Sequence, residues 1–165
     1  MAVASKSIHI NAPTDRVFAY LADLERHIEW SGEFSFGLEK IRVVTPGPLK
    51  PGSVFKSLGL LSSTAGVEDT STITEIEPNS RLAWETVSDG AGQQNTFHWA
   101  YTLKPQNDGT RLTYSLLERR FSPKPIQLWF PPLLWLIDRK VFGREMTSGL
   151  KKIKEAMEQR GFTPS

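Results

Sequence analysis

Residues 126–161 read IQLWFPPLLWLIDRKVFGREMTSGLKKIKEAMEQRG, and the pattern in this stretch decides the fold. No proline follows Pro132 within it, and apolar residues recur at steps of three, four or seven. That spacing predicts one long α-helix with a continuous apolar face. The residues on this face are Trp135, Phe142, Met146, Leu150, Ile153 and Met157. Such a face must be covered, and the segments before it are the cover that the chain offers.

Most of the chain before this helix has the pattern of β-strands. Residues 7–11 alternate polar and apolar side chains, as a strand with one wet face does. Helical spacing follows Pro13, first up to Leu24 and then in a shorter segment at 25–30 that directs Ile28 and Trp30 inward. Six further strands, separated by turn residues, are predicted at 38–44, 53–61, 67–77, 81–87, 96–103 and 110–120.

The order of these elements indicates an α+β fold. Consecutive hairpins make a sheet antiparallel, and period-two alternation means that it buries one face only. We therefore predict a seven-stranded curved antiparallel sheet wrapped around the long C-terminal helix, with two short helices after strand 1. The length of 165 residues fits a single domain, 1–165.

Composition excludes several classes of function. The net charge is +2 and the charges are scattered, so we expect no nucleic-acid partner. The chain has no cysteine, which excludes disulfides, a thiolate nucleophile and a Cys-ligated zinc. The N-terminus lacks the apolar run of a secretory signal, and residues 126–137 are too short and too interrupted by proline to cross a membrane. We expect a cytoplasmic protein.

Three segments resemble one known superfamily. Residues 8–23, IHINAPTDRVFAYLAD, followed by Trp30, are similar to the opening segment of SRPBCC proteins, the START-like or pollen-allergen-like helix-grip proteins, in their polyketide cyclase/dehydrase branch. Residues 74–84 resemble the central hairpin of that branch, and residues 101–105 with 109–114 resemble its last one. The resemblance implies a helix-grip fold with a cavity between the long helix and the concave face of the sheet, open to a hydrophobic small molecule. It carries over no catalytic motif.

Large side chains are available to line such a cavity. Rings and one flexible thioether suit an apolar ligand, although the same side chains would also fill a solid core. The phenol groups of Tyr101 and Tyr114 offer hydrogen bonds to a ligand carbonyl. The candidate ligand contacts are Trp30, Trp84, Trp99, Tyr101, Tyr114, Trp135, Phe142 and Met146, with Phe97 and Trp129 in the same set.

Glu118 is the candidate acid–base residue, with Tyr114 beside it. Counting by twos from Leu112, Tyr114 and Leu116 directs Glu118 to the inner face, where burial would raise the pKa of its carboxyl group. The alternative is that the strand ends there in water and that Arg120 pairs with Glu118. The phase of residues 68–72, which include Asp69 and Ser71, stays ambiguous.

The histidines do not indicate a metal site. His9 and His98 alternate with inward residues and should face outward, and His27 is predicted on the surface. No phosphate-binding or dinucleotide-binding glycine loop is present. We therefore expect no cofactor, and any enzyme would be a cyclase, aromatase or dehydratase that uses neither a metal nor a nucleotide.

The apolar run at 126–137 has three interpretations: a packed gate over the cavity, a homodimer contact, and a contact with a membrane surface. Gly143 and Gly149 within the predicted helix each lower its stability relative to alanine. Close approach of a strand or ligand would explain these glycines, and so would a tolerated loss of helix stability. The leading hypothesis is a carrier or sensor of a hydrophobic or aromatic small molecule. The alternatives are an enzyme of the cyclase or dehydratase type and an interaction module that uses the run at 126–137.

Overall fold

A computed structural model describes residues 2–31, 38–59, 68–90, 93–122 and 131–159, with side chains for all of these except 90, 93, 121 and 131–138. The helices are α1 (Thr14–Ala22), the 3₁₀ turn η1 (Leu24–Arg26), α2 (His27–Trp30) and α4 (Pro131–Gln159). The strands are β1 (Ala4–Ile10), β2 (Leu38–Val43), β3 (Val54–Gly59), β4 (Asp69–Glu77), β5 (Arg81–Gly90), β6 (Gln93–Gln106) and β7 (Gly109–Ser122).

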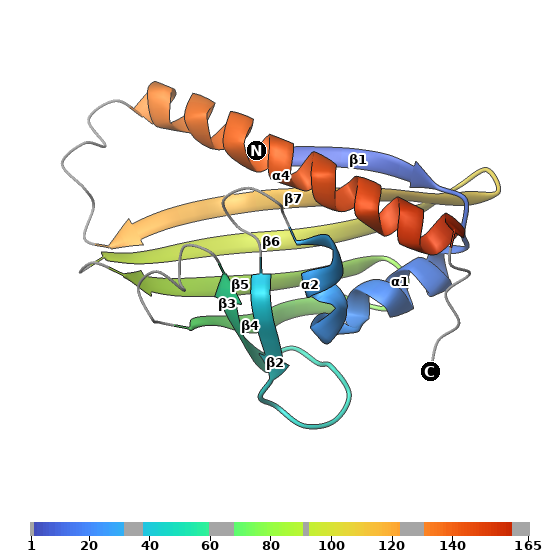
Figure 1. Ribbon diagram of the computed structural model, residues 1–165, viewed down its shortest axis with the longest axis horizontal. Coiled ribbons are helices and arrows are strands. Elements are labelled where there is room, and N and C mark those ends of the chain that lie inside the picture. Colours follow the sequence, from blue (N-terminus) through green and yellow to red (C-terminus); the bar gives the residue numbers. More distant parts are fainter. Residues whose placement is uncertain (1, 32–37, 60–67, 91–92, 123–130, 160–165) are drawn as a thin grey trace.

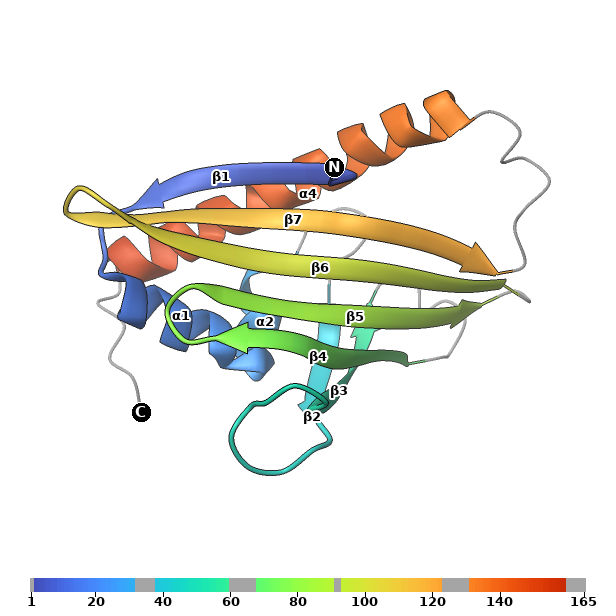
Figure 2. The same cartoon turned by 180° about the vertical axis from the view of Figure 1, so that it is seen from behind.

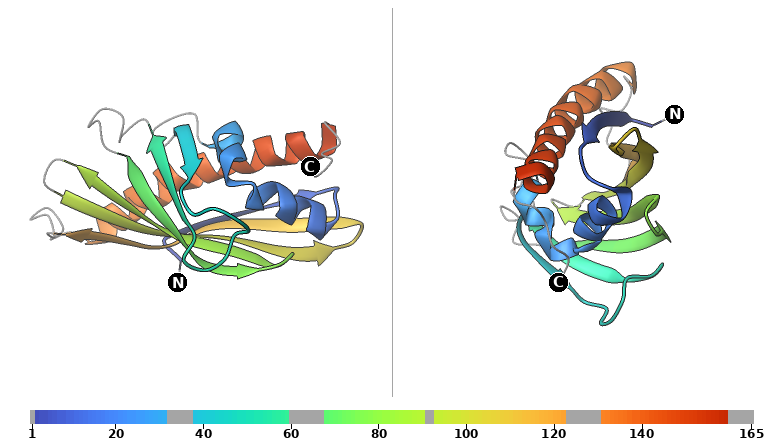
Figure 3. Two further views of the ribbon diagram at one scale, coloured as in Figure 1. Left: turned by 90° about the horizontal axis from the view of Figure 1, so that it is seen from below. Right: turned by 90° about the vertical axis from the view of Figure 1, so that its right-hand side faces the viewer.

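The strands form one antiparallel sheet in the order β1-β7-β6-β5-β4-β3-β2. The sheet curls, and α4 lies across its concave side (Figures 1 and 2). Seen end-on in Figure 3, the sheet and the short helices surround a common interior with α4 along its upper edge. The predicted α+β fold with seven strands and a long C-terminal helix is confirmed.

Helix α4 begins at Pro131, since proline is tolerated in a first helical turn. Its apolar face is buried as predicted at Phe142, Met146, Leu150, Ile153 and Met157. Two hydrogen bonds attach the C-terminal half of the helix to the end of β1 and the residue that follows it. Lys154 Nζ donates a hydrogen bond to the carbonyl of His9 at 2.8 Å, and the backbone N–H of Asn11 donates to Glu158 Oε1, also at 2.8 Å.

The helix also lies close to α2. A Cβ atom on Gly149 would sit 2.9 Å from the carbonyl oxygen of Trp30, so glycine is required there by another helix and not by a strand or a ligand. On Gly143 a Cβ would meet only the flexible end of Lys6, at 3.3 Å. Helices α1, η1 and α2 therefore cover the end of the sheet that faces the C-terminal half of α4 (Figure 1).

Two predictions for α2 are wrong. Ile28 is 45% exposed, whereas His27, predicted on the surface, is only 5% exposed. The reason is that α2 is one turn of four residues, so His27 and Trp30 share its buried face. The imidazole Nε2 of His27 lies 2.8 Å from the carbonyl oxygen of Leu21, where a neutral ring donates a hydrogen bond. Burial lowers the pKa of His27 to about 4, so the ring is neutral at pH 7.

Candidate functional site

The register of β4 to β7 arranges the concave face in rows of side chains. Neighbouring strands pair Leu82 with Tyr101 and Tyr101 with Tyr114, and in the next row Trp84 with Trp99 and Trp99 with Leu116. The row after that is polar except for one ring. It contains Ser71, Thr86, Phe97 and Arg119. The interior therefore changes along the strands, from aliphatic and aromatic to polar, as the face approaches the start of α4.

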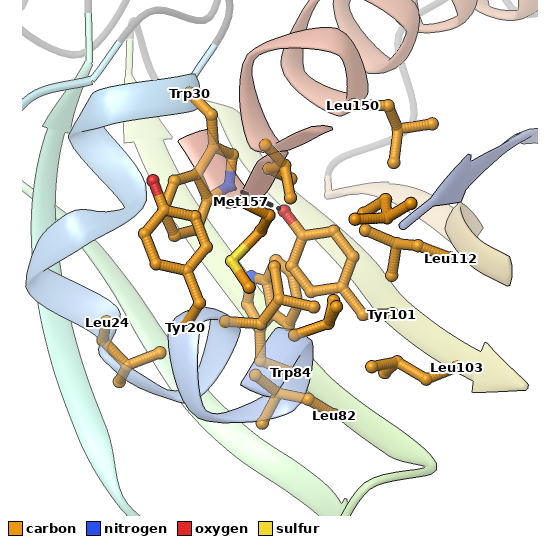
Figure 4. Close-up of a cluster of buried hydrophobic side chains, with 14 of the residues drawn as sticks. Tyr20, Leu24, Trp30, Leu82, Trp84, Tyr101, Leu103, Leu112, Leu150 and Met157 are labelled. Carbon is orange, nitrogen blue, oxygen red and sulfur yellow. Dashed lines mark hydrogen bonds between the residues drawn. The ribbon is translucent and has the colours of Figure 1, made fainter. Parts of the chain in front are cut away.

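We call the first part the closed end, because its side chains bury one another beneath α1, α2 and the C-terminal half of α4 (Figure 4). Trp30 and Tyr101 are 3% and 2% exposed, and the indole Nε1 of Trp30 donates a hydrogen bond of 3.1 Å to the phenol oxygen of Tyr101. The ring centroids of Trp84 and Tyr101 lie 5.3 Å apart. This end is a packed core in which the buried polar atoms of Trp30 and Tyr101 satisfy each other.

We call the second part the open end, because aromatic rings on the concave face stay partly exposed there. These rings are Phe97, Trp99 and Tyr114. Trp99 stacks on Phe97 with centroids 5.8 Å apart and meets the ring of Phe142 from α4 edge-on at 5.7 Å. The helix thus touches this end at Phe142 and Met146 without covering its rings completely.

The two tyrosines join the ends. Their ring centroids are 4.6 Å apart, and their phenol groups are hydrogen-bonded to each other. Burial raises the pKa of both phenols, and the nearby carboxylate of Glu145 raises that of Tyr114 further. Both groups are therefore neutral at pH 7, so they act as hydrogen-bond donors or acceptors and not as phenolate bases.

A β-bulge overturns the predicted orientation of Glu118. His98 pairs with Glu118, but the next residue, Trp99, pairs with Leu116, so Leu117 is an extra residue in β7. Beyond this bulge the count by twos fails. The side chain of Glu118 is 53% exposed and its Oε1 lies 3.4 Å from Arg120 Nε, which is the ion pair that the alternative predicted.

Arg119 takes the inner position that was predicted for Glu118. It pairs with Phe97 across the sheet, and its guanidinium carbon lies 5.3 Å from the ring centroid of Phe97 and 5.6 Å from that of Phe142. A guanidinium over aromatic faces is attracted by their quadrupoles. The Nε atom of Arg119 is buried, so this charge belongs to the interior.

Other polar groups accompany Arg119 at the open end. The sequence left open which residues at the start of β4 face the interior. Asp69 and Ser71 do, because Asp69 pairs with the inward Ser57 and Ser71 pairs with the buried Phe55. The hydroxyls of Ser71 and Thr86 are hydrogen-bonded at 2.8 Å. Asn95 Oδ1 is buried and has no hydrogen-bond partner among the described residues.

Sequence reasoning missed Arg119, Asn95, Thr86 and Glu145. Two of them left a signal. Glu145, which is 9% exposed, lies three residues after Phe142 and so borders the apolar face of the helix. Thr86 lies within the predicted strand 81–87, two residues after Trp84. Arg119 depends on the bulge at Leu117, and Asn95 lies before the predicted start of its strand.

Some predicted residues lie elsewhere. His98 faces outward as expected, where it contacts Glu85 and Arg120. Residues 126–130, with Trp129, lie outside the described residues, as does the side chain of Trp135. Among the described side chains no group of three or more His, Asp or Glu residues has the arrangement of a metal site. No helix in the described part of the chain is long and apolar enough to span a membrane.

Comparison with known proteins gives a family and a fold. The family described as "Polyketide cyclase / dehydrase and lipid transport" matches residues 1–158. No curated protein matches the sequence. The fold is similar to that of NE0264 from Nitrosomonas europaea, with a TM-score of 0.64, 14% identity and 94% of each chain covered. It is also similar to CV1439 from Chromobacterium violaceum, with a TM-score of 0.60, 18% identity and coverage of 93% of this chain and 96% of that one.

A third similar structure comes from a biosynthetic context. It is DynU16, described as a putative protein in the dynemicin biosynthetic locus, with a TM-score of 0.60 and 16% identity. The match covers 98% of this chain but 48% of DynU16, so the chain spans about half the length of that protein. Identities this low establish a shared fold.

Proposed function

The chain belongs to the polyketide cyclase/dehydrase and lipid transport family, and on that premise we propose that it is a carrier or sensor that binds a hydrophobic or aromatic small molecule at the open end. One observation carries this proposal: Phe97, Trp99 and Tyr114 face the interior and yet remain partly exposed. Aromatic rings that gather on an inner face and stay partly exposed are typical of a site for an apolar ligand.

The proposed contacts differ in kind. Phe97, Trp99 and Tyr114 would touch the ligand directly, since their rings are partly exposed. Phe142 and Met146, which are 2% and 1% exposed, would support these rings from α4. Trp30, Trp84 and Tyr101 would form the floor that limits how deep a ligand enters. Trp135, the remaining candidate, belongs to the first turns of α4 and stays a prediction.

The test is to fill the open end with a side chain. Thr86 faces the interior opposite Phe97, whereas Thr96 faces outward opposite Val87. In Thr86→Trp we expect the affinity for the neutral fluorescent probe N-phenyl-1-naphthylamine to fall at least about tenfold, and in Thr96→Trp we expect a change of less than about twofold. Equal affinities in both variants, or no binding by the unmodified protein, would refute the proposal. Native mass spectrometry of freshly purified protein would identify a ligand that co-purifies.

A second proposal is an enzyme of the cyclase, aromatase or dehydratase type. The observation in its favour is Glu145, a largely buried carboxylate close enough to Tyr114 to raise the pKa of that phenol. In a dehydration, such a carboxylate would take the proton from the carbon next to a carbonyl and then give it to the β-hydroxyl group. The C–O bond would break as the C=C bond forms, and the hydroxyl group would leave as water. Tyr114 would donate a hydrogen bond to the carbonyl oxygen.

The two proposals are distinguished with 4-hydroxy-4-(2-naphthyl)-2-butanone, which loses water to give a conjugated enone with a longer absorption wavelength. An enzyme would form this enone faster than buffer, and Glu145→Gln would abolish turnover while retaining the binding of N-phenyl-1-naphthylamine. Glu118→Gln is the matched control, because Glu118 is exposed. If the unmodified protein does not form the enone faster than buffer, the enzyme proposal is refuted and the carrier proposal stands.

Location and assembly are also proposals. We propose a cytoplasmic protein with no metal, nucleotide or nucleic-acid partner, and a homodimer through residues 126–137 ranks above a membrane contact for the same segment. A dimer that depends on this segment would dissociate in Trp129→Ser, as measured by sedimentation velocity at several concentrations.

A further inference from the structure

The open end is polar in a specific way. Along the strands, the row of Trp84 and Trp99 is followed by the row that contains Thr86 and Arg119. A ligand that fits aromatic rings at one end therefore meets hydrogen-bonding groups at the other. A ligand oxygen can accept a hydrogen bond there, whereas a pure hydrocarbon cannot.

Arg119 is the strongest hydrogen-bond donor in this part of the interior. A guanidinium carries five N–H groups in one plane and accepts no hydrogen bond. Its guanidinium carbon lies 5.3 and 5.6 Å from the ring centroids of Phe97 and Phe142, so cation–π attraction holds the group beside both rings. Both rings border the open end, so the guanidinium lies in the part of the interior that the proposed ligand occupies.

The charges nearby favour a neutral acceptor over an anion. Asp69 and Glu145 face the same interior, and both have a buried carboxylate oxygen. Among the described side chains, this interior thus holds two carboxyl groups and one guanidinium, so a bound carboxylate would add to the negative charge there and a carbonyl would not. The phenol of Tyr114, neutral because of its raised pKa, adds no charge.

We infer that the ligand is an aromatic ketone or a related neutral carbonyl compound, whose rings lie on Trp99 and Tyr114 and whose carbonyl oxygen accepts a hydrogen bond from Arg119. This inference rests on the proposed function, since it names the chemical class that the open end receives. Arg119 determines the specificity for the carbonyl oxygen, and the aromatic rings supply the part of the affinity that does not depend on this oxygen.

The experiment compares two probes of nearly equal shape, 2-acetylnaphthalene and 2-isopropenylnaphthalene, which differ in a C=O against a C=CH₂ group. Dissociation constants are measured by equilibrium dialysis for the unmodified protein, Arg119→Met and Arg120→Met. Methionine retains an unbranched apolar stem and removes the donors of arginine. Arg120 is the matched control, because it is the adjacent residue and faces outward to Glu118 and Glu85.

We expect Arg119→Met to weaken the ketone about tenfold and the hydrocarbon less than about twofold, because a charge-assisted hydrogen bond is lost with the ketone only. Arg120→Met should change neither by more than about twofold. Equal weakening of both probes by Arg119→Met, or an unchanged affinity for the ketone, overturns the inference and leaves the proposed function standing. Failure of both probes to bind the unmodified protein refutes the proposed function itself.

Two further measurements keep the inference testable if Arg119→Met does not fold. The carbonyl ¹³C signal of labelled 2-acetylnaphthalene bound to the unmodified protein should shift downfield from its position in hexane, as a hydrogen-bonded carbonyl does, and no shift would contradict the inference. The anion 2-naphthoate should bind more weakly than the ketone. Tighter binding of 2-naphthoate would overturn the assignment of a neutral carbonyl.

Discussion

The closed and open ends are built from the same strands but use aromatic residues differently. At the closed end Trp30 and Tyr101 are almost completely buried and hydrogen-bond each other, while at the open end Phe97 and Trp99 lie on the same face of the sheet and stay partly exposed. Complete burial and partial exposure of the aromatic rings are therefore separated along the strands and not between the two faces of the sheet.

The largest expected effect is at Trp30. Trp30→Ala should lower the free energy of unfolding by about 4 kcal/mol, because it removes a buried ring and leaves the phenol of Tyr101 without its indole donor. Phe97→Ala, at the open end, should cost no more than about 2 kcal/mol, since part of that ring is already in water. Urea unfolding measures both values. Equal losses in the two variants would mean that the ends do not differ in packing.

The second effect is a dependence of stability on pH that arises at the closed end. The pKa of His27 is lowered from 6.5 to about 4, so the unfolded chain binds a proton at a pH where the native chain does not. The stability contributed by neutral His27 is complete above pH 6.5 and is lost as the pH falls from 6.5 to 4. The difference between these values corresponds to about 3 kcal/mol.

His27→Gln should remove most of this dependence, because glutamine retains a donor for the carbonyl of Leu21 and does not titrate. The measurement is the change in the free energy of unfolding between pH 7 and pH 4.5, with the unmodified protein as reference. The same change in both proteins would show that other groups cause the acid sensitivity.

The third effect compares the two helix glycines. Gly149→Ala should destabilise the protein by about 1–2 kcal/mol, because the gain in helix propensity is outweighed by a contact of 2.9 Å with the backbone of Trp30. Gly143→Ala meets only the mobile end of Lys6 and should be neutral or stabilising by up to about 1 kcal/mol. Thermal unfolding of the pair measures the difference, and stabilisation by Gly149→Ala would show that α2 can move away from α4.

The smallest effect is expected at Glu118. Glu118→Gln should change the free energy of unfolding by less than about 0.5 kcal/mol and leave the affinity for N-phenyl-1-naphthylamine unaltered, because the ion pair with Arg120 is exposed. Chemical denaturation and a fluorescence titration test both values. A loss of probe affinity would place Glu118 near the ligand after all.

Much of the architecture could be predicted from periodicity. The apolar face of α4 and the alternation in β6 gave the correct buried residues, such as Leu150, Ile153 and Tyr101, because burial of one face imposes a strict period on the sequence. His27 could not be predicted, because the direction of a side chain on a single helical turn depends on its tertiary neighbours. The same holds for Ile28.

The open end was less predictable than the fold. Arg119 lies beyond a bulge and Asn95 lies in a strand extension, and neither feature leaves a regular pattern in the sequence. Counting by twos gave Glu118, whereas the paired strands give Arg119. The sign of the charge at this inner position of β7 thus depends on one extra residue, Leu117, which only the strand register reveals.

The bulge at Leu117 also affects how this chain is compared with its relatives. Deleting Leu117 would restore a regular strand and still direct Arg119 inward, so a relative with one residue fewer in β7 would keep the same interior. An alignment without a gap at this point would match Arg119 to the wrong residue of such a relative. Functional residues should therefore be transferred between these proteins by superposing strand partners, and not by column position in a sequence alignment.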